Sequence, residues 1–477
     1  MELYAIKING WKNPMGFDYG VPQCSWKVRG NTGSRQETAR ISVGLDETLQ
    51  KVIFQKEGKL NSLGEPLDFP LKPYTRYWYT VAVRSDHGEE AVSQPCFFET
   101  GKLDDPWVGQ WLGVEDGDTH PEFQKTFSLP EKPRSARLYI CGLGLFEAYL
   151  NGGKAGNDLL TPFLNDYTEH FQYCTYDVTS LLAQDNTLSV LLGDGWYRGH
   201  FGLGEPTHYE RPLALMAELR MEFADGHTET LCSDSGWQYR SSFTTLSDIY
   251  NGETQDYTKA PGDWKQPVLI PAPGRLCDRY SSPLHYMESI PVKEVIHTPL
   301  GETVLDFGQN FAGHVVCTQP IPEGTAMTLE FGEVLQNGNF YHENYRHAES
   351  KFTYVSDGVL RQIRPRFTFF GFRYVKVSGL DRVDAACFEG RAIYSEMDRT
   401  GFIRTGNEKI NRLFSNSLWG LKSNFLDIPT DCPQRDERLG WTGDAQVFCT
   451  TAGFHMDTRA FYRKFLRDLR SDQRRNN

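Results

Sequence analysis

The sequence predicts a multidomain, mainly β protein in which successive β-sandwich domains are followed by the first helices of an all-helical domain. Residues 1–398 consist mostly of short segments that alternate apolar and polar side chains, and turn residues separate these segments. After Asn407 the spacing of apolar residues becomes helical. A chain of 477 residues is also longer than one hydrophobic core usually serves, so we expect several domains.

Residues 1–103 are predicted to form a β-sandwich of the immunoglobulin or fibronectin III type. The segment TRYWYTVAVRSDHG at 75–88 alternates with a period of two and ends in a polar turn, and a second strand follows near Phe97 and Phe98. The residues GKLDDP at 101–106 resemble a linker. The sequence therefore places the first domain boundary near residue 103.

Two further β domains are predicted, a jelly roll at 104–290 and a β-sandwich at 291–398. The segment RLYICGLGLFEAYLNGG at 137–153 alternates and ends in an Asn-Gly-Gly turn, which is a strong hairpin signal. The segment NTLSVLLGDGWYRG at 186–199 is typical of a buried strand that ends in a glycine-rich loop. The third unit contains predicted strands near 304–307, 326–331 and 372–377.

Residues 399–477 are predicted to be helical. Asn407 suits an N-cap, Glu408 suits the first turn, and a second helix is expected from Thr458. Each predicted helix carries apolar residues on one face, which are Ile410, Leu413, Phe414, Leu418, Leu421 and Phe425 in the first and Phe461, Phe465, Leu466 and Leu469 in the second. We read these two helices as the opening of an all-helical domain.

Composition excludes several classes of partner. The net charge of −12 and the pI of about 5.5 argue against binding to nucleic acid or to an anionic membrane. The ten cysteines show no CxxC and no spacing typical of zinc ligands, so we expect free thiols, no metal and no cofactor. The N-terminus has no signal-peptide pattern, which makes a cytoplasmic location the expectation.

One segment between the two predicted helices combines charged and aromatic residues unusually densely. It reads DIPTDCPQRDERLGWTGDAQ at 427–446 and contains five carboxylates, two arginines and one tryptophan. Carboxylates hydrogen-bond sugar hydroxyls, arginine orients carboxylates, and an indole ring offers a stacking surface. Like charge and desolvation can raise the pKa of one carboxyl among several, as a general acid at neutral pH requires. The alternative is a surface loop of ion pairs around a core tryptophan.

The string DCPQRDERLGWTGDAQ at 431–446 resembles the signature of the α-L-rhamnosidases of glycoside hydrolase family 78. The resemblance extends to WKNPMGFDYGVPQCSWKV at 11–28, FEAYLNGG at 146–153, LDFGQNFAGHV at 305–315 and RFTFFGFRYVKV at 366–377. It implies an Ig-like domain, a carbohydrate-binding-like jelly roll, a β-sandwich and then an (α/α)₆ barrel that holds the active site.

The resemblance also implies roles for individual residues. Glu437 matches the general acid that protonates the leaving glycosidic oxygen, and Asp431 matches the carboxylate that binds rhamnose hydroxyls. Arg435, Trp441 and Asp444 match substrate-binding positions in the same loop. We expect Asp436, which is adjacent to Glu437, to be an ion-pair partner of Arg435 or Arg438.

The predicted function is hydrolysis of terminal α-L-rhamnosyl groups of plant glycosides or polysaccharides by an inverting acid/base mechanism. The family's general base, a glutamate far downstream, has no counterpart here, so we expect the 477-residue chain alone to be inactive. The alternatives are a non-catalytic carbohydrate-binding or scaffold protein, and an (α/α)₆ glycosidase with another sugar preference. The oligomeric state is not predicted.

Two other groups of residues allow alternative readings. Trp196 and Tyr197 form either a sugar platform on the jelly roll or part of its packing. His342, Glu343 and His347 suggest a metal site, but their irregular spacing favours a solvent-facing loop.

Overall fold

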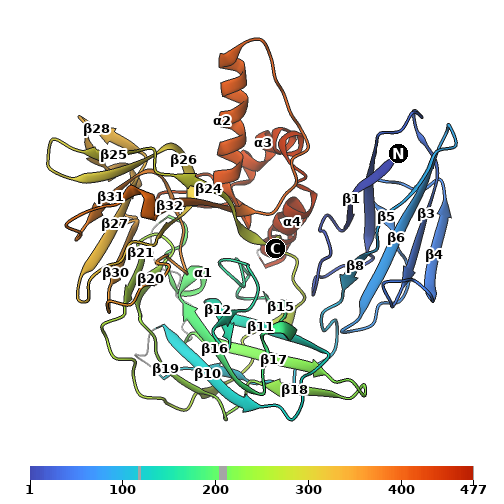
Figure 1. The fold of residues 1–477 in the computed structure, drawn as a ribbon, viewed down its shortest axis with the longest axis horizontal. Coiled ribbons are helices and arrows are strands. Elements are labelled where there is room, and N and C mark those ends of the chain that lie inside the picture. Colours follow the sequence, from blue (N-terminus) through green and yellow to red (C-terminus); the bar gives the residue numbers. More distant parts are fainter. Residues whose placement is uncertain (116–119, 204–211, 476–477) are drawn as a thin grey trace. The chain divides into compact units, whose positions relative to one another are not determined.

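The computed structural model describes residues 1–115, 120–203 and 212–475, and it divides into two compact units. The first unit consists of Met1–Val108 with the short segments Gln172–Tyr176 and Leu276–Tyr280. The second unit contains Gly109–Phe171, Asp177–Arg275 and Ser281–Asn477. Strands dominate both units, and the long helices of the described residues begin only at Glu408, as the sequence predicts (Figure 1).

The first unit contains two antiparallel sheets, in agreement with the Ig-like sandwich predicted for this region. One sheet has the order β1-β2-β5, and the other has the order β4-β3-β6-β7 with β8 on β6. Tyr77, Tyr79, Val81 and Val83 of the predicted alternating segment are at most 3% exposed. The bounds are β1 Glu2–Ile8, β2 Gln23–Arg29, β3 Gln36–Gly44, β4 Val52–Gly58, β5 Glu65–Pro66, β6 Arg76–Ser85, β7 Glu90–Val92 and β8 Cys96–Glu99.

The second unit begins with two antiparallel sheets that correspond to the predicted jelly roll. One has the order β13-β12-β16-β10-β19, and the other contains β11-β17-β9-β22 with β18 on β17. The bounds are β9 Trp111–Gly113, β10 Pro121–Ser128, β11 Ser135–Leu143, β12 Leu145–Leu150, β13 Gly153–Lys154, β16 Asp185–Gly193, β17 Ala214–Glu222, β18 Thr228–Cys232, β19 Gln238–Ser241 and β22 Val268–Ile270. Short elements accompany them: β14 His170–Gln172, β15 Cys174–Asp177, β23 Arg275–Cys277, the 3₁₀ turn Thr179–Leu181 and α1 Gly195–Arg198.

A nine-stranded sheet forms the next layer of the second unit. Its order is β20-β21-β30-β27-β31-β26-β32-β24 with β25 on β26, and its phenylalanine-rich core includes Phe331, Phe370 and Phe372. Three of its strands, β20, β21 and β24, begin before residue 291. The bounds are β20 Thr244–Asp248, β21 Gly252–Asp256, β24 Leu284–Pro291, β25 Glu294–His297, β26 Thr303–Cys317, β27 Ala326–Gly332, β30 Lys351–Val355, β31 Phe370–Ser378 and β32 Phe388–Ser395, and a separate hairpin pairs β28 Val334–Gln336 with β29 Asn339–Tyr341.

Three helices end the described chain: α2 Glu408–Asn424, α3 Thr442–His455 and α4 Arg459–Arg475. The predicted N-cap is confirmed, because the Asn407 side chain accepts a hydrogen bond from the amide of Lys409. The sequence did not predict α3, because its apolar residues follow no helical stripe: Val447 is 80% exposed and Ala452 is buried. Among the described residues no helix combines the length and the apolar character that crossing a bilayer requires.

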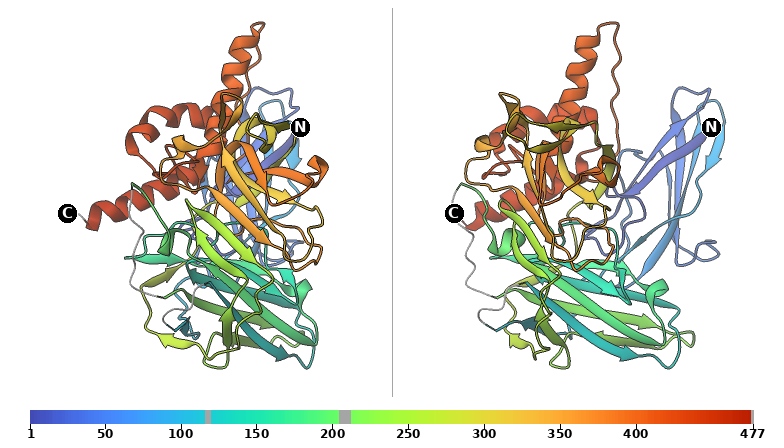
Figure 2. Two further views of the ribbon diagram at one scale, coloured as in Figure 1. Left: turned by 90° about the vertical axis from the view of Figure 1, so that its left-hand side faces the viewer. Right: turned by 60° about the vertical axis from the view of Figure 1, so that its left-hand side comes forward.

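The apolar stripe of α2 is buried only in its C-terminal half. Leu418 and Leu421 pack in a cluster with Phe425 and Phe461, whereas Ile410 and Leu413 are 50% and 68% exposed. Figure 2 shows this N-terminal half of α2 projecting beyond the neighbouring strands of its unit.

A buried ion triad anchors α4 beside the segment that carries the predicted site. Lys464 lies 2.8 Å from Asp427 and 2.7 Å from Asp468, and the side chains of Lys464 and Asp427 are at most 1% exposed. Asp427 also accepts a hydrogen bond from the backbone amide of Leu164 in the jelly roll. Burying an ammonium group is costly unless it is paired, and here two carboxylates offset that cost. The chain is thereby held in place four residues before Asp431.

Candidate functional site

Arg438 occupies the centre of the loop at 430–441 and holds it against the β domains. Its side chain is 1% exposed. The guanidinium donates hydrogen bonds to the carbonyl oxygens of Ile249 at 2.8 Å, Phe369 at 2.9 Å, Gln434 at 3.0 Å and Arg435 at 3.1 Å. Burial lowers the pKa of Arg438. Because two acceptors belong to the loop and two to distant segments, this one side chain ties the loop to both segments.

Further contacts close the loop around Arg438. The amide of Asp431 donates to the carbonyl of Leu439, and the amide of Leu439 donates to Asp431 Oδ1 at 3.0 Å. The hydroxyl of Tyr250 donates to the carbonyl oxygen of Glu437, and the Tyr250 ring lies 5.0 Å from the Arg438 guanidinium carbon. The backbone on both sides of Glu437 is therefore fixed before any ligand arrives.

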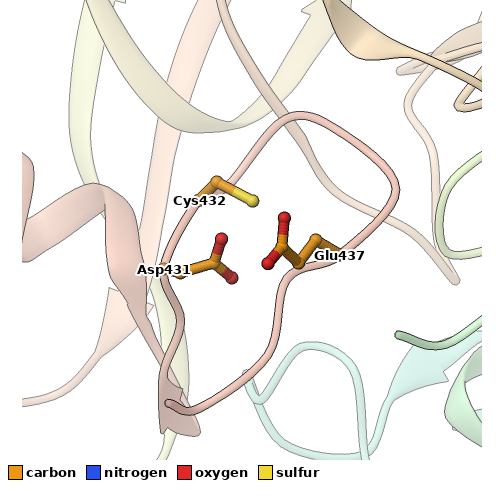
Figure 3. Close-up of side chains that lie close together, drawn as sticks. All are labelled: Asp431, Cys432 and Glu437. Atoms are coloured by element: carbon orange, nitrogen blue, oxygen red, sulfur yellow. The ribbon is translucent and has the colours of Figure 1, made fainter. Parts of the chain in front are cut away.

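The loop brings three of the predicted or neighbouring side chains together. One ligand atom each of Asp431, Cys432 and Glu437 lies within 4.8 Å of the others, and the three side chains point toward one another inside the loop (Figure 3). Arg435 reaches each of them: Nη2 lies 3.4 Å from Asp431 and 3.0 Å from Glu437, and Nε donates to Cys432 Sγ at 3.4 Å. The guanidinium of Arg435 therefore contacts all three side chains and brings positive charge to the cluster.

The predicted acid, Glu437, has two further partners. Arg346 Nη2 donates to Glu437 Oε2 at 2.7 Å, and the indole Trp441 Nε1 donates to Oε1 at 3.1 Å. Arg346 lies just after the 3₁₀ turn Glu343–Tyr345, in a different domain from the loop. Sequence reasoning missed it, because nothing in its neighbourhood indicates a partner 91 positions away.

The partner predicted for Asp436 is wrong. Its carboxylate lies 2.7 Å from Nε of Arg346, whereas Arg435 and Arg438 were expected. Both arginines have other partners. Arg435 pairs with Asp431 and Glu437, and the buried Arg438 donates to carbonyl oxygens. Arg346 thus pairs with both neighbouring carboxylates of the motif.

Glu437 does not show the raised pKa that like charge and desolvation can give one carboxyl of such a loop. Burial does raise the pKa, but hydrogen bonds from Arg346 and Trp441 and the charges of Arg435 and Arg346 outweigh it and lower the pKa below the usual glutamate value. Glu437 is therefore ionised at neutral pH in this geometry. Cys432 is the opposite case, because burial raises the pKa of its thiol to about 11.

The remaining predicted residues lie at the exposed edge of the loop. Trp441 is 43% exposed and precedes α3, so one part of its ring system is open to solvent while its N–H is engaged by Glu437. Asp444 lies in the first turn of α3 and is exposed. In the part of the chain that the structure describes, Asp444 makes no hydrogen bond or ion pair with Asp431, Arg435, Glu437 or Trp441.

The two alternative sites receive no support from the geometry. Trp196 and Tyr197 are 4% and 1% exposed, so their rings are part of the packing of the jelly roll and leave no face open for a sugar. Glu343 and His347 are exposed, and no metal-type cluster among the described residues includes them or His342.

We expect Arg346→Met to raise the pKa of Glu437, because the substitution removes both a hydrogen bond and a positive charge from the ionised carboxylate. Titration of the glutamate side-chain carbons by NMR measures this shift. Arg361→Met is the matched control, since Arg361 pairs with Asp357 elsewhere in the nine-stranded-sheet domain. An unchanged Glu437 titration in Arg346→Met would show that this ion pair does not set the pKa.

Protein-family models cover most of the chain. They describe a Rha78A-like N-terminal immunoglobulin domain at 3–104, an α-L-rhamnosidase N-terminal domain at 131–283, a bacterial α-L-rhamnosidase concanavalin-like domain at 296–394 and a bacterial α-L-rhamnosidase 6 hairpin glycosidase domain at 398–477. The four models follow one another in the order of the sheets and helices described above.

Relatives and solved structures carry the same name. An α-L-rhamnosidase of Alteromonas sp. (strain LOR) is 32% identical over 98% of this chain and 55% of the relative. An α-L-rhamnosidase of Streptomyces avermitilis is 38% identical over 80% of this chain and 39% of the relative. The crystal structure of native α-L-rhamnosidase from Aspergillus terreus superposes with a TM-score of 0.90 at 31% identity, covering 99% of this chain and 58% of that chain. The crystal structure of the Streptomyces avermitilis α-L-rhamnosidase complexed with L-rhamnose has a TM-score of 0.90 at 25% identity. The match covers 98% of this chain and 65% of that chain.

The chain spans about half the length of the curated relatives it matches. The same domains occur in the same order along nearly all of the chain, and the structural match covers 99% of it. The chain belongs to the bacterial α-L-rhamnosidase family.

Proposed function

We propose that the protein hydrolyses terminal α-L-rhamnosyl groups of rhamnose-containing glycosides. The observation that carries the proposal is the cluster of Asp431, Arg435, Glu437 and Trp441 on a loop that Arg438 holds rigidly. The cluster combines a carboxyl group, hydrogen-bonding partners for hydroxyls and an open indole ring, which are the groups that sugar hydrolysis needs. The names of the relatives and the L-rhamnose bound to one of them support the same substrate.

Glu437 is the group that we assign to proton donation. Its carboxyl proton would pass to the glycosidic oxygen while the bond between that oxygen and the anomeric carbon breaks. Asp431 and Arg435 would hold the sugar hydroxyls, and Trp441 would both position the Glu437 carboxylate and present its ring to the sugar.

A general acid must carry its proton when the substrate is bound, and Glu437 is ionised in the present geometry. Burial already opposes ionisation, and a bound sugar would exclude more water from the carboxylate. A sugar hydroxyl that accepts a hydrogen bond from Arg435 would also weaken the contact between Arg435 and Glu437. Both changes raise the pKa, so substrate binding and protonation of Glu437 are coupled in this proposal.

The spacing of the carboxylates bears on the choice between inversion and retention. Inverting glycosidases separate the two carboxyl groups by about 6.5–9.5 Å to make room for a water molecule, whereas retaining enzymes bring them to about 5–5.5 Å. Asp431 and Glu437 approach within 4.8 Å, which is too close for Asp431 to activate a water. Asp431 is also engaged by Arg435 and the amide of Leu439. We therefore assign Asp431 to binding and not to the base of the inverting mechanism.

One experiment tests the sugar preference and the stereochemistry together. The intact natural protein is incubated with a panel of nitrophenyl glycosides, and proton NMR follows the anomer that is released first. We expect hydrolysis of the α-L-rhamnoside in preference to the other glycosides, with β-L-rhamnose as the first product. Preference for another sugar would indicate a different glycosidase. First release of α-L-rhamnose would make Asp431 a nucleophile, and binding without any hydrolysis would favour the scaffold alternative.

A further inference from the structure

Arg346 reaches the predicted acid from outside the motif loop. It follows the 3₁₀ turn Glu343–Tyr345 of the nine-stranded-sheet domain and lies 91 positions before Glu437. Its Nη2 atom donates to Glu437 Oε2 at 2.7 Å and to the backbone carbonyl oxygen of Asp436 at 2.7 Å. Its Nε atom lies 2.7 Å from the Asp436 carboxylate. One guanidinium from a β domain therefore contacts both the backbone beside the acid and the carboxylate of the acid itself.

The turn that carries Arg346 is fixed by its own domain. Tyr345 is fully buried, and its hydroxyl donates to the carbonyl oxygen of Gly371 in β31 at 2.6 Å. The amide of Arg346 donates to the carbonyl oxygen of Glu343, and the amide of Ala348 donates to that of Tyr345. The sheet therefore sets where the guanidinium lies, and a group that orients another residue has to be held in this way.

The backbone of Arg346 adopts a conformation that a residue with a Cβ atom rarely takes. Its φ is 59° and its ψ is −111°. Glycine tolerates a positive φ without a steric cost, whereas arginine does not. Strained residues persist only where their surroundings hold them, and they concentrate at active sites. An arginine at a position that favours glycine indicates that its side chain is needed there.

Two cations contact Glu437, and substrate binding affects them differently. Arg435 would bind sugar hydroxyls, so its contact with Glu437 weakens when the substrate arrives. Over the residues that the structure describes, Arg346 makes no hydrogen bond or ion pair with Asp431, which is assigned to the hydroxyls. The backbone carbonyl of Asp436 also keeps Arg346 in place whether or not a sugar is bound. Arg346 is therefore the cation that stays with Glu437 during the reaction.

The charge of Arg346 acts on a carboxylate that is largely shielded from water. The Arg346 side chain is 39% exposed, so solvent screens part of its charge, but the side chain of Glu437 is only 13% exposed. Burial raises the pKa of Glu437, and the hydrogen bond from Arg346 is the largest of the opposing effects that lower the pKa overall. The other charged or titratable groups around this carboxylate are Asp431, Cys432, Arg435 and Asp436.

We propose that Arg346 is a positioning residue for the general acid: it orients the Glu437 carboxyl and stabilises the negative charge that Glu437 acquires as its proton leaves. This role rests on the proposed function, which makes Glu437 the proton donor. The proton passes to the glycosidic oxygen, and the bond from that oxygen to the anomeric carbon breaks with its electron pair on the oxygen. Water replaces the leaving oxygen at the anomeric carbon, and Glu437 remains as a carboxylate. Arg346 transfers no proton, but it stabilises this carboxylate more than the neutral acid.

Two opposite changes are expected in Arg346→Met, and pH profiles of kcat for the intact natural protein measure both. Below the alkaline limb, kcat for α-L-rhamnosides with poor leaving groups should fall by about tenfold or more, because the acid is weaker and less well oriented. Nitrophenyl α-L-rhamnoside should be affected much less, since nitrophenol leaves without protonation. The alkaline limb for the poor leaving groups should move to higher pH, because a carboxyl that has lost a stabilising cation keeps its proton longer.

Three further variants separate positioning from folding. Arg361→Met is the matched control, because it removes an ion pair with Asp357 in the same domain and should leave the rates and the limb unchanged. Arg346→Lys keeps a positive charge without the planar fork of donors, so its limb should lie between those of the natural protein and Arg346→Met. Arg346→Gly removes the same contacts as Arg346→Met but suits the positive φ, so it should be at least as stable thermally and should show the same limb.

Several results would overturn this role. One is an alkaline limb that does not move in Arg346→Met while the protein still hydrolyses rhamnosides, which would leave the proposed function standing. Another is an equal loss for every leaving group, because that would make Arg346 a purely structural residue. Absence of rhamnosidase activity in the natural protein is a different outcome, and it would reject the proposed function together with this role.

Discussion

Glu437→Gln is expected to reduce kcat/KM by about 10²–10⁴ for substrates with poor leaving groups, because a glutamine cannot donate the proton that the departing oxygen needs. Nitrophenol leaves without protonation, so nitrophenyl α-L-rhamnoside should be affected far less. The pH profile should also lose its alkaline limb, since activity that requires protonated Glu437 falls as the pH rises through its pKa in the complex. Kinetics of the intact protein with a series of leaving groups measure both effects.

Two neighbouring carboxylates provide the controls for this prediction. Asp431→Asn removes a predicted hydroxyl contact, so its loss should be similar for every leaving group. Asp436→Asn breaks the contact with Arg346 and should show no dependence on the leaving group. Equal losses across leaving groups in Glu437→Gln, together with a dependence in Asp436→Asn, would move the acid to Asp436.

Arg438→Met is expected to lower the free energy of unfolding by on the order of 3 kcal/mol or more. Four carbonyl oxygens lose their donor, and each buried acceptor left unpaired costs about 1–3 kcal/mol, part of which relaxation and water recover. The amides of 430–441 should exchange with solvent faster, and hydrolysis should be lost with them, because the backbone of Glu437 is no longer held.

Arg404→Met serves as the comparison for Arg438→Met. Arg404 is exposed, so its replacement should change stability by less than about 0.5 kcal/mol. Thermal unfolding and hydrogen exchange are measured on both variants. If Arg438→Met kept both the stability and the exchange protection of the loop, the loop would be held by other contacts such as that of Tyr250 with Glu437.

Local sequence patterns were sufficient to predict the β domains and two of the three long helices. The alternation at 75–88 predicted β6 because successive strand residues face opposite sides of a sheet, and every second residue is indeed buried. Asn407 predicted the start of α2 because capping is a contact between residues two apart. The helix α3 was missed because burial in it follows no periodic stripe, so periodicity carried no signal.

The sequence by itself determined the fold class, the family resemblance and the segment 431–446 in which the chemistry is predicted to lie. Only the tertiary structure decided which residues hold that segment in place and whether Glu437 is ionised. Arg346 reaches the loop from 91 positions away, and Arg438 of the loop binds carbonyl oxygens 69 and 189 positions away, so no local pattern encodes these contacts. The lowered pKa of Glu437 follows from those partners, because the balance between burial and nearby cations depends on distances that exist only after the domains have packed.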